Sequence, residues 1–296
     1  MAENGKISIS RQRWKLLAQV ITRQPDYLSD PENNSVSVRR FNNFGLLEVR
    51  VHEDGISKDS NSVWLEYSSK DFADISCVIR QLQGNVTLDT LLGFNNTGNV
   101  CVWPSEEVMA YYCLKHREDF RSKVVCEVGG GMTCLAGVFT AVCTEAAEVV
   151  LTDGNEESVN NLTYTVARNQ QSVGSTKCSA RLLRWGPDLN MPELESKFDS
   201  ILCADCLFFD EGREHLVNML SLMLKPGGQA LMFAPTRGNT FHEFTKLALK
   251  TFELEVKKNY DDIVWNLHQK FLSQGNDVYV ENLHYPVMLV LTKPMP

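Results

Sequence analysis

A turn of consecutive glycines follows an apolar segment in the middle of the chain. The turn consists of Gly129, Gly130 and Gly131. Val125–Val128 before it predicts a buried strand, and Met132–Cys143 after it predicts a helix. Glycines there let a ligand approach the backbone, and the first turn of a helix presents N–H groups to a carboxylate or phosphate. A dinucleotide fingerprint would have another glycine in place of Cys134, and Glu127 favours an ammonium or hydroxyl donor over pyrophosphate.

A second acid, Asp153, ends the next predicted strand. An acid in this place can accept hydrogen bonds from both ribose hydroxyls, whether the nucleoside belongs to NAD or to S-adenosylmethionine. Alone, Asp153 could equally cap the following helix, but with the glycine turn it predicts a nucleoside site. Trp103, before the first strand, and Trp185, at the end of the third, stand where an adenine or methionine portion could lie against a ring.

An acid and an aromatic residue follow the fourth predicted strand, Asp199–Ala204. They are Asp205 and Phe208, and we expect them beside the reactive end of the cofactor. Cys203 and Cys206 form a C-x-x-C pair, but strand alternation predicts that they face opposite sides of the sheet. No second cysteine or histidine pair lies at ligand spacing, so we expect no metal site.

The elements that position these residues alternate between strand and helix after residue 95, which predicts an α/β fold with a mostly parallel sheet covered on both faces. Seven strands are expected, at Lys123–Val128, Glu148–Thr152, Lys177–Trp185, Asp199–Ala204, Gln229–Ala234, Phe252–Lys257 and Val287–Thr292. Helices are expected between them, at Met132–Cys143, Glu156–Asn169, Arg213–Leu224, Phe241–Thr251 and Ile263–Phe271. A further helix should begin near Trp103, because a proline and two acids follow it.

The N-terminal third of the chain has a different texture. Strand-like segments alternate with polar stretches there, at Trp64–Ser68, Ile75–Leu82 and the polar Glu53–Ser62. A basic amphipathic helix is expected over Arg11–Arg23. We therefore divide the chain into an extension of strands and a helix that docks the substrate, residues 1–95, and a catalytic domain, residues 96–296.

The composition excludes several classes of protein. The 296 residues carry 37 acidic and 29 basic side chains, for a net charge of -8, and this excess repels phosphate backbones, so no nucleic-acid partner is expected. No apolar stretch approaches the roughly 20 residues of a membrane helix. The polar N-terminus lacks the pattern of a secretory signal, and the nine cysteines lack the spacing of a disulfide framework, which favours a cytoplasmic location, extending to the nucleus.

These features together resemble the seven-strand, Rossmann-like S-adenosylmethionine-dependent methyltransferases. Within that class the chain is most similar to the lysine methyltransferase branch that modifies single non-histone proteins, and to its members that act on calmodulin. The resemblance rests on the motifs Asn95–Val108, Gly129–Gly137, Thr152–Glu156, Cys203–Phe208 and Glu281–Pro286, with shorter matches at Arg13–Leu17 and Val36–Phe41.

The resemblance implies a reaction and a set of site residues. S-adenosylmethionine is the implied methyl donor, held by Trp103, Glu127, Gly129, Gly130, Gly131, Asp153, Trp185 and Ala204. Asp205 is expected to accept a hydrogen bond from the substrate amine, and Phe208 to form an apolar wall that favours methylammonium, with Tyr285 as a second candidate wall. Many relatives have tyrosine where Phe208 stands. The implied product is trimethyllysine in the loop between the third and fourth calcium-binding hands of calmodulin, made by a monomeric enzyme.

Docking of calmodulin, which is acidic, requires a basic surface. We place this surface on the N-terminal extension, at Arg11, Arg13, Lys15, Arg39, Arg40 and Arg80. Three other functions remain open: methylation of another protein lysine, a nicotinamide-dependent oxidoreductase, and a binding module without activity. Cys134 and the helix Ile263–Phe271 disfavour the oxidoreductase, and measuring the binding of each cofactor separates it from a methyltransferase.

Overall fold

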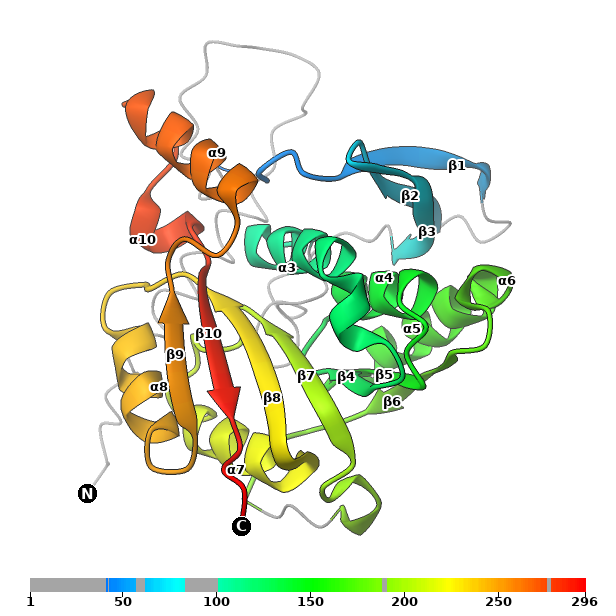
Figure 1. Cartoon of the computed structure of the whole chain (residues 1–296). Coiled ribbons are helices and arrows are strands. Elements are labelled where there is room, and N and C mark those ends of the chain that lie inside the picture. Colours follow the sequence, from blue (N-terminus) through cyan, green and yellow to red (C-terminus); the bar gives the residue numbers. More distant parts are fainter. Residues whose placement is uncertain (1–40, 42, 57–61, 83–100, 188–190, 276–277) are drawn as a thin grey trace, which may run out of the picture.

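The computed structural model describes residues 41, 43–56, 62–82, 101–187, 191–275 and 278–296. Two sheets form this part of the chain, one of seven strands and one of three (Figure 1). The helix expected at Arg11–Arg23, the first residues of the motif at Asn95, and five of the six proposed docking residues (Arg11, Arg13, Lys15, Arg39 and Arg40) lie outside the described residues.

The seven-stranded sheet confirms the predicted α/β fold. Its strands are β4 (Val124–Glu127), β5 (Glu148–Asp153), β6 (Lys177–Leu182), β7 (Phe198–Ala204), β8 (Leu224–Ala234), β9 (Glu253–Lys257) and β10 (Val287–Thr292). The order is β6-β5-β4-β7-β8-β10-β9, and β10 runs antiparallel to both of its neighbours. β8 begins at Leu224, earlier than the predicted Gln229, because the strand runs on through Gly227 and Gly228, and Gly228 approaches the backbone of β7 closely.

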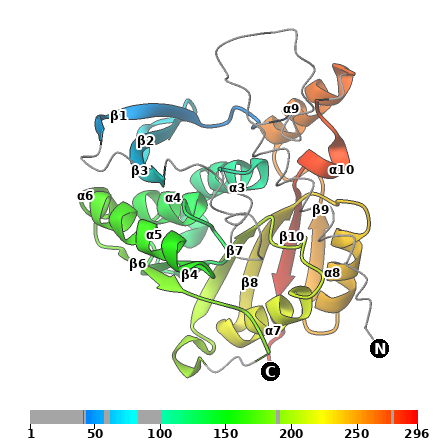
Figure 2. The same cartoon turned by 180° about the vertical axis from the view of Figure 1, so that it is seen from behind.

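Helices cover both faces of this sheet (Figures 1 and 2). One group comprises α3 (Pro104–Lys115), α4 (Leu135–Cys143), α5 (Glu156–Arg168) and α6 (Gln170–Val173), and the other comprises α7 (Arg213–Met223) and α8 (Thr240–Ala248). Successive strand residues enter opposite cores: Val149 packs with α3 and α4, and Val150 packs with α7 and α8. This is the alternation that a sheet buried on both faces requires. None of the described helices has the length and hydropathy of a membrane-crossing segment.

The three-stranded antiparallel sheet consists of β1 (Glu48–Ile56), β2 (Ser62–Ser69) and β3 (Phe72–Leu82). β1 includes residues that we expected to be a polar connection. The outer edge of β3 is covered by α5, because Asn169 exchanges hydrogen bonds with both backbone groups of Val78, at 2.9 and 2.6 Å, and Asn161 donates to the carbonyl of Arg80 at 2.8 Å. Side chains of a helix thus replace the neighbour that an edge strand lacks.

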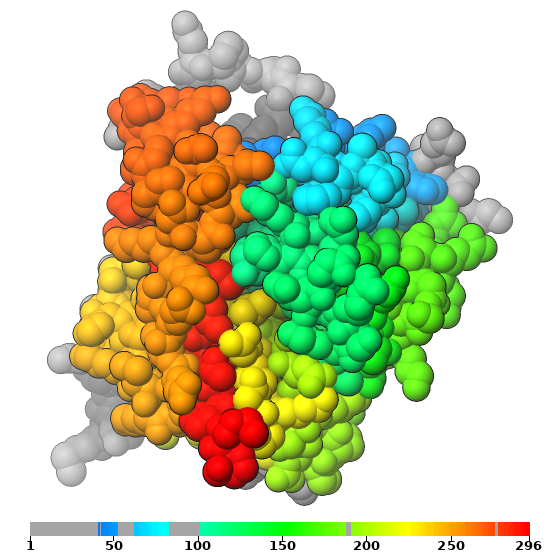
Figure 3. Space-filling model, viewed as in Figure 1, coloured from blue at the N-terminus to red at the C-terminus, as the bar shows by residue number. Residues whose placement is uncertain are grey.

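The three-stranded sheet and a helical pair flank the carboxyl ends of the parallel strands. The pair consists of α9 (Asp262–Ser273) and α10 (Glu281–His284), between β9 and β10, and in Figures 1 and 3 it lies opposite β1–β3 across the top of the molecule. Phe41 packs edge-on against Phe271 and Tyr279, with ring centroids 5.1 and 4.7 Å apart. The residues before β1 therefore share a core with the helical pair. The boundary at residue 95 and the docking role of the extension remain predictions.

One face of α3 holds these flanking elements in place. Glu107 is buried, and its carboxylate accepts the backbone N–H groups of Phe44 at 2.6 Å and Leu46 at 2.8 Å. One turn later, the hydroxyl of Tyr111 donates to Asp71 in the β2–β3 turn at 2.7 Å. Residues four apart lie on the same side of a helix, so one face of α3 binds both the segment before β1 and the β2–β3 turn.

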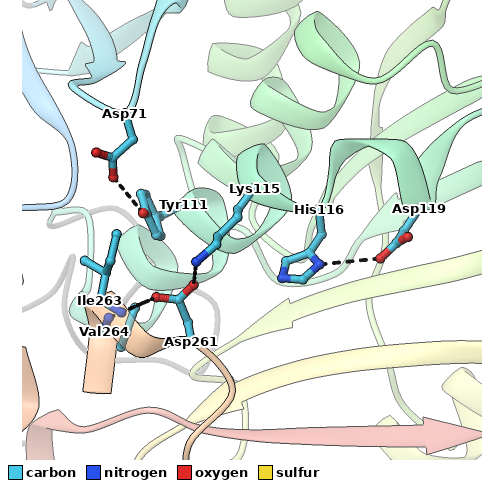
Figure 4. Close-up of polar contacts among 8 residues, drawn as sticks. All are labelled: Asp71, Tyr111, Lys115, His116, Asp119, Asp261, Ile263 and Val264. Atoms are coloured by element: carbon cyan, nitrogen blue, oxygen red, sulfur yellow. Dashed lines mark hydrogen bonds and ion pairs between the residues drawn. The ribbon is translucent and has the colours of Figure 1, made fainter. Parts of the chain in front are cut away.

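The same face continues to α9. Lys115 forms an ion pair with Asp261 at 2.5 Å, and Asp261 caps α9 by accepting the N–H groups of Ile263 and Val264 at 2.9 and 3.0 Å (Figure 4). Asp261 is only 6% exposed, so its charge is compensated by the lysine and by the N-terminus of the helix. α3 therefore fixes both flanks of the carboxyl edge relative to the sheet.

Candidate active site

The glycine turn lies at the end of β4, as predicted, and its conformation requires glycine. Gly129 and Gly131 have φ of +64° and +62°, a region that residues with a Cβ rarely adopt. A Cβ on Gly129 would lie 2.8 Å from Cys206 Sγ and 2.9 Å from the ring of Trp185. The turn is thus packed directly against residues that follow β6 and β7.

The helix after the turn starts later than predicted. Cys134 has φ +40°, and α4 begins at Leu135 instead of Met132. Its first N–H groups are bound by protein carboxylates: Leu135 donates to Glu106 at 3.2 Å, and Gly137 donates to Glu127 at 2.6 Å. The expectation that this helix presents free N–H groups to a ligand is therefore wrong for these two groups.

Three buried carboxyl groups surround the turn. Burial raises the pKa of Glu106 to about 7, that of Glu127 to about 8 and that of Asp153 to about 6. The charge of Asp153 also raises the pKa of Glu106 and Glu127, and that of Glu106 raises the pKa of Glu127, because like charges at short range disfavour ionisation. One oxygen of Glu127, Oε1, accepts no hydrogen bond from the described residues. Such an orphaned buried acceptor fits a site that completes its hydrogen bonds with a ligand or a proton.

Asp153 lies at the end of β5, next to the turn. Its Oδ2 accepts the N–H of Gly131 at 2.9 Å, and its Oδ1 accepts that of Asn155 at 2.8 Å. Asn155, not Asp153, caps α5, because its side chain accepts the N–H groups of Glu157 and Ser158. A carboxylate has acceptor positions beyond these hydrogen bonds, so Asp153 can still accept from a hydroxyl, and its predicted role at the ribose stays a prediction.

The two tryptophans lie on the same edge of the sheet. The ring of Trp185, after β6, packs over Gly129. Trp103 precedes α3, and its carbonyl accepts the N–H groups of Glu106 and Glu107, both at 3.0 Å. Since Glu106 binds Thr133 and Leu135 beyond the glycine turn, Trp103 is tied to the turn through this acid. The glycines mark the position of this site in the sequence, but no sequence pattern singled out Glu106 as part of it.

The end of β7 brings Ala204, Asp205 and Phe208 to this edge. Asp205 has φ +56°, and its carboxylate forms two hydrogen bonds with Arg237, both of 2.6 Å. Arg237 follows β8 and was not foreseen, because nothing in its local sequence marks it. Phe208 is half-buried and packs edge-on against Phe209 at 5.1 Å. The roles assigned to Asp205, Phe208 and the cofactor-binding residues remain predictions.

Cys203, in β7, and Cys206, after it, pack in the same core, so the expectation that they face opposite sides of the sheet is wrong. The Cys206 thiol donates to the carbonyls of Ala204 at 3.3 Å and Val128 at 3.6 Å, and the neighbouring Cys203 together with burial raises the pKa of Cys206. The left-handed conformation of Asp205 ends the strand's alternation and turns Cys206 back. Among the residues that the structure describes, no three His, Cys, Asp or Glu side chains are grouped as ligands for a metal ion.

Tyr285 lies elsewhere than expected, whereas Arg80 lies in β3, within the N-terminal extension on which we placed the docking surface. Tyr285 is 2% exposed, stacks on His268 at 3.9 Å between centroids and donates its hydroxyl to the carbonyl of Lys258. It belongs to the aromatic core under α9 and does not form an open wall. Arg80 donates to Asn161 at 3.2 Å and lies over the ring of Tyr164 at 4.7 Å, so part of its charge is engaged by α5.

The fold and the site together define the class of protein. A glycine turn, an acid at the end of the second strand and two tryptophans lie together at the carboxyl edge of a seven-stranded sheet with one reversed strand. This is the arrangement of an S-adenosylmethionine-dependent methyltransferase.

Comparison with known proteins identifies the family. A model of a lysine methyltransferase family matches residues 87–251. The calmodulin-lysine N-methyltransferase of Arabidopsis thaliana is 33% identical over 299 residues, which cover 96% of this chain and 97% of the relative. EEF1A lysine methyltransferase 3 of Mus musculus is 25% identical over 57% of this chain and 70% of its own. A methyltransferase crystal structure from Pyrococcus furiosus has a TM-score of 0.45 and 16% identity, covering 64% of this chain and 83% of its own. The chain belongs to the lysine methyltransferase family.

The residues around the turn fit S-adenosylmethionine. Asp153 offers acceptors for ribose hydroxyls, Glu127 Oε1 is an acceptor without a donor among the described residues, and a Cβ at Gly129 would fill the space beside Trp185. A cationic methyl donor also suits a site with three acidic side chains, because each carboxylate that ionises gains a counter-charge.

Proposed function

We propose that this protein transfers methyl groups from S-adenosylmethionine to a lysine of calmodulin. The observation that carries the proposal is the end-to-end match to a calmodulin-lysine N-methyltransferase, which includes the N-terminal part as well as the catalytic domain. A match restricted to the sheet would indicate only a shared cofactor. Because the N-terminal part is shared too, the relative supports a common protein substrate.

Residues at the carboxyl edge are suited to the steps that the reaction requires. Bound S-adenosylmethionine supplies an electrophilic methyl group, and its transfer is an in-line displacement that depends on alignment. A lysine amine has a pKa near 10.4 and must lose its proton before it can attack. Asp205 and the carbonyl of Ala204 lie at the end of β7, where they can accept hydrogen bonds from that amine. The ring of Phe208 can form an apolar wall beside it.

The flanks of the carboxyl edge support a protein as substrate. β1–β3 and the pair α9–α10 lie on either side of this edge (Figure 1), and α3 holds both through Glu107, Tyr111 and Lys115. Such walls admit only a side chain that projects far enough to reach the carboxyl edge. A lysine on the surface of a protein is a side chain of this kind. The basic docking surface on the N-terminal extension remains part of the proposal.

The test is methyl transfer from labelled S-adenosylmethionine to unmodified calmodulin, with mass spectrometry to locate the lysine and count the methyl groups. We expect a single labelled lysine, and no label when that lysine is replaced by arginine. Asp153→Ala should lose labelling at low cofactor concentration, whereas the exposed Glu157→Ala should not. Labelling of other proteins but not of calmodulin would contradict the substrate, and absence of labelling in every protein offered would contradict the activity.

A further inference from the structure

Asp205 and Arg237 face each other from the ends of two neighbouring parallel strands. Both have left-handed backbones, with φ of +56° and +38°, although neither is glycine. The two hydrogen bonds between their side chains are 2.6 Å each, and the side chains are only 12% and 28% exposed. Backbone strain of this kind persists where the surrounding structure holds it, and it concentrates at functional sites.

The arginine is also tied to the helical pair. The N–H of Arg237 donates to the carbonyl of Asn282 in α10 at 2.7 Å. His284, at the end of α10, has its pKa lowered to about 4 by burial and by the charge of Arg237. His284 is therefore neutral at physiological pH, and Arg237 is the cation that faces Asp205.

The charge of this pair matters for the reaction. An isolated carboxylate beside the substrate lysine would stabilise its ammonium form and raise its pKa, which opposes the loss of the proton. A carboxylate already paired with a guanidinium carries no net charge into the site, yet its oxygens retain acceptor positions for an amine N–H. The pair can thus orient the amine without retaining its proton.

We propose that Arg237 is the positioning residue of Asp205, which it orients and neutralises so that the substrate lysine reacts as a free amine. This inference rests on the proposed lysine methylation. Two other titratable groups face the pair: Arg237 lowers the pKa of His284 in α10, and Asp205 raises the pKa of Cys206 in the turn after β7, as does Asp153 from β5. Burial raises the pKa of Asp205 and Arg237 opposes that rise, in agreement with a carboxylate that depends on its partner.

The test uses the full chain, S-adenosylmethionine and calmodulin, with kcat measured against pH. In Arg237→Met the acid limb of kcat should move upward by about 1 to 3 pH units, while cofactor affinity stays within about twofold. Arg237→Lys should restore the position of the limb but not the full kcat, because an ammonium cannot bind both oxygens. The double variant Asp205→Asn/Arg237→Met should return the limb towards wild type, because it leaves no unpaired carboxylate. Arg181→Met, which breaks the exposed pair with Glu193, is the matched control.

A purely structural role would lower kcat in Arg237→Met without moving the limb, and this result would overturn the proposal. A limb that stays displaced in the double variant would overturn it as well. A second measurement needs no turnover: relative to wild type, Arg237→Met should lose more thermal stability at pH 8 than at pH 5, since its unpaired, buried Asp205 favours the protonated form. An unchanged pH dependence would refute the pairing. If the wild-type protein methylates no calmodulin, the proposed function fails. The stability comparison then still tests whether Arg237 pairs with Asp205.

Discussion

Glu127 is predicted to make the stability of the cofactor-free protein fall as the pH rises. Its carboxyl is fully buried, accepts one hydrogen bond from Gly137 and leaves Oε1 without a donor among the described residues. Glu127→Gln replaces it by a neutral side chain of the same shape, whose amide oxygen can still accept the Gly137 N–H. The variant therefore removes the titration and keeps the packing.

The magnitude follows from the raised pKa. In the folded chain Glu127 has a pKa of about 8, against about 4.3 in the unfolded chain. Between these values the folded state holds a proton that the unfolded state has lost, so stability decreases with rising pH by about 1.4 kcal/mol per pH unit. From pH 5.5 to 7.5 this amounts to about 3 kcal/mol, or roughly 5 to 10 °C in Tm for a domain of this size. Glu106 and Asp153 also make stability decrease with rising pH, up to a pH of about 7 for Glu106 and about 6 for Asp153.

The assay is thermal unfolding of the cofactor-free protein at pH 5.5, 6.5 and 7.5. Glu127→Gln should exceed wild type already at pH 5.5, by about 1.6 kcal/mol, and by about 4 kcal/mol at pH 7.5, with a shallower dependence on pH throughout. Glu157→Gln, an exposed position on α5, should follow wild type at every pH. If Glu127→Gln and wild type show the same dependence, the carboxyl is ionised in the fold and the reasoning is wrong.

Two other variants test the site and its support. Asp153→Ala should weaken S-adenosylmethionine binding about 10- to 100-fold, since a charge-assisted acceptor for the ribose hydroxyls is lost. Calorimetry on the folded variant measures this affinity. Unchanged affinity would show that Asp153 does not bind the cofactor. Glu107→Ala should destabilise the fold by about 3 kcal/mol or more, because the buried N–H groups of Phe44 and Leu46 lose their acceptor. Thermal unfolding measures this loss of stability, and Tyr111→Phe, which removes a single hydroxyl, is the control. Equal losses of stability in both variants would contradict the prediction that Glu107 contributes more than Tyr111.

Local sequence was sufficient for the seven-stranded sheet and for placing the glycine turn and Asp153 at its carboxyl edge. Strands such as β5 and β10 are buried on both faces and read as continuous apolar runs, so their limits are visible in the residues themselves. The glycine turn and Asp153 were predictable for a related reason. A backbone with φ above zero restricts the residue type, and the end of a strand fixes which edge the next side chain occupies.

Other features depend on contacts between distant segments, and no local pattern marks them. Asn161 and Asn169 look like exposed positions of α5, yet they are buried because they cover the edge of β3. Glu107 looks like an ordinary acid in the first turn of a helix, although it binds the backbone some 60 residues earlier.

The pairing of Asp205 with Arg237 is the clearest case of this kind. The two residues lie 32 positions apart, and they meet only because β7 and β8 are adjacent and parallel. Residue type and periodicity decide which elements form and which residues stand at their ends. Which charge faces which is decided by the order of strands in the sheet, since electrostatic pairing depends on distance in space and not on distance along the chain.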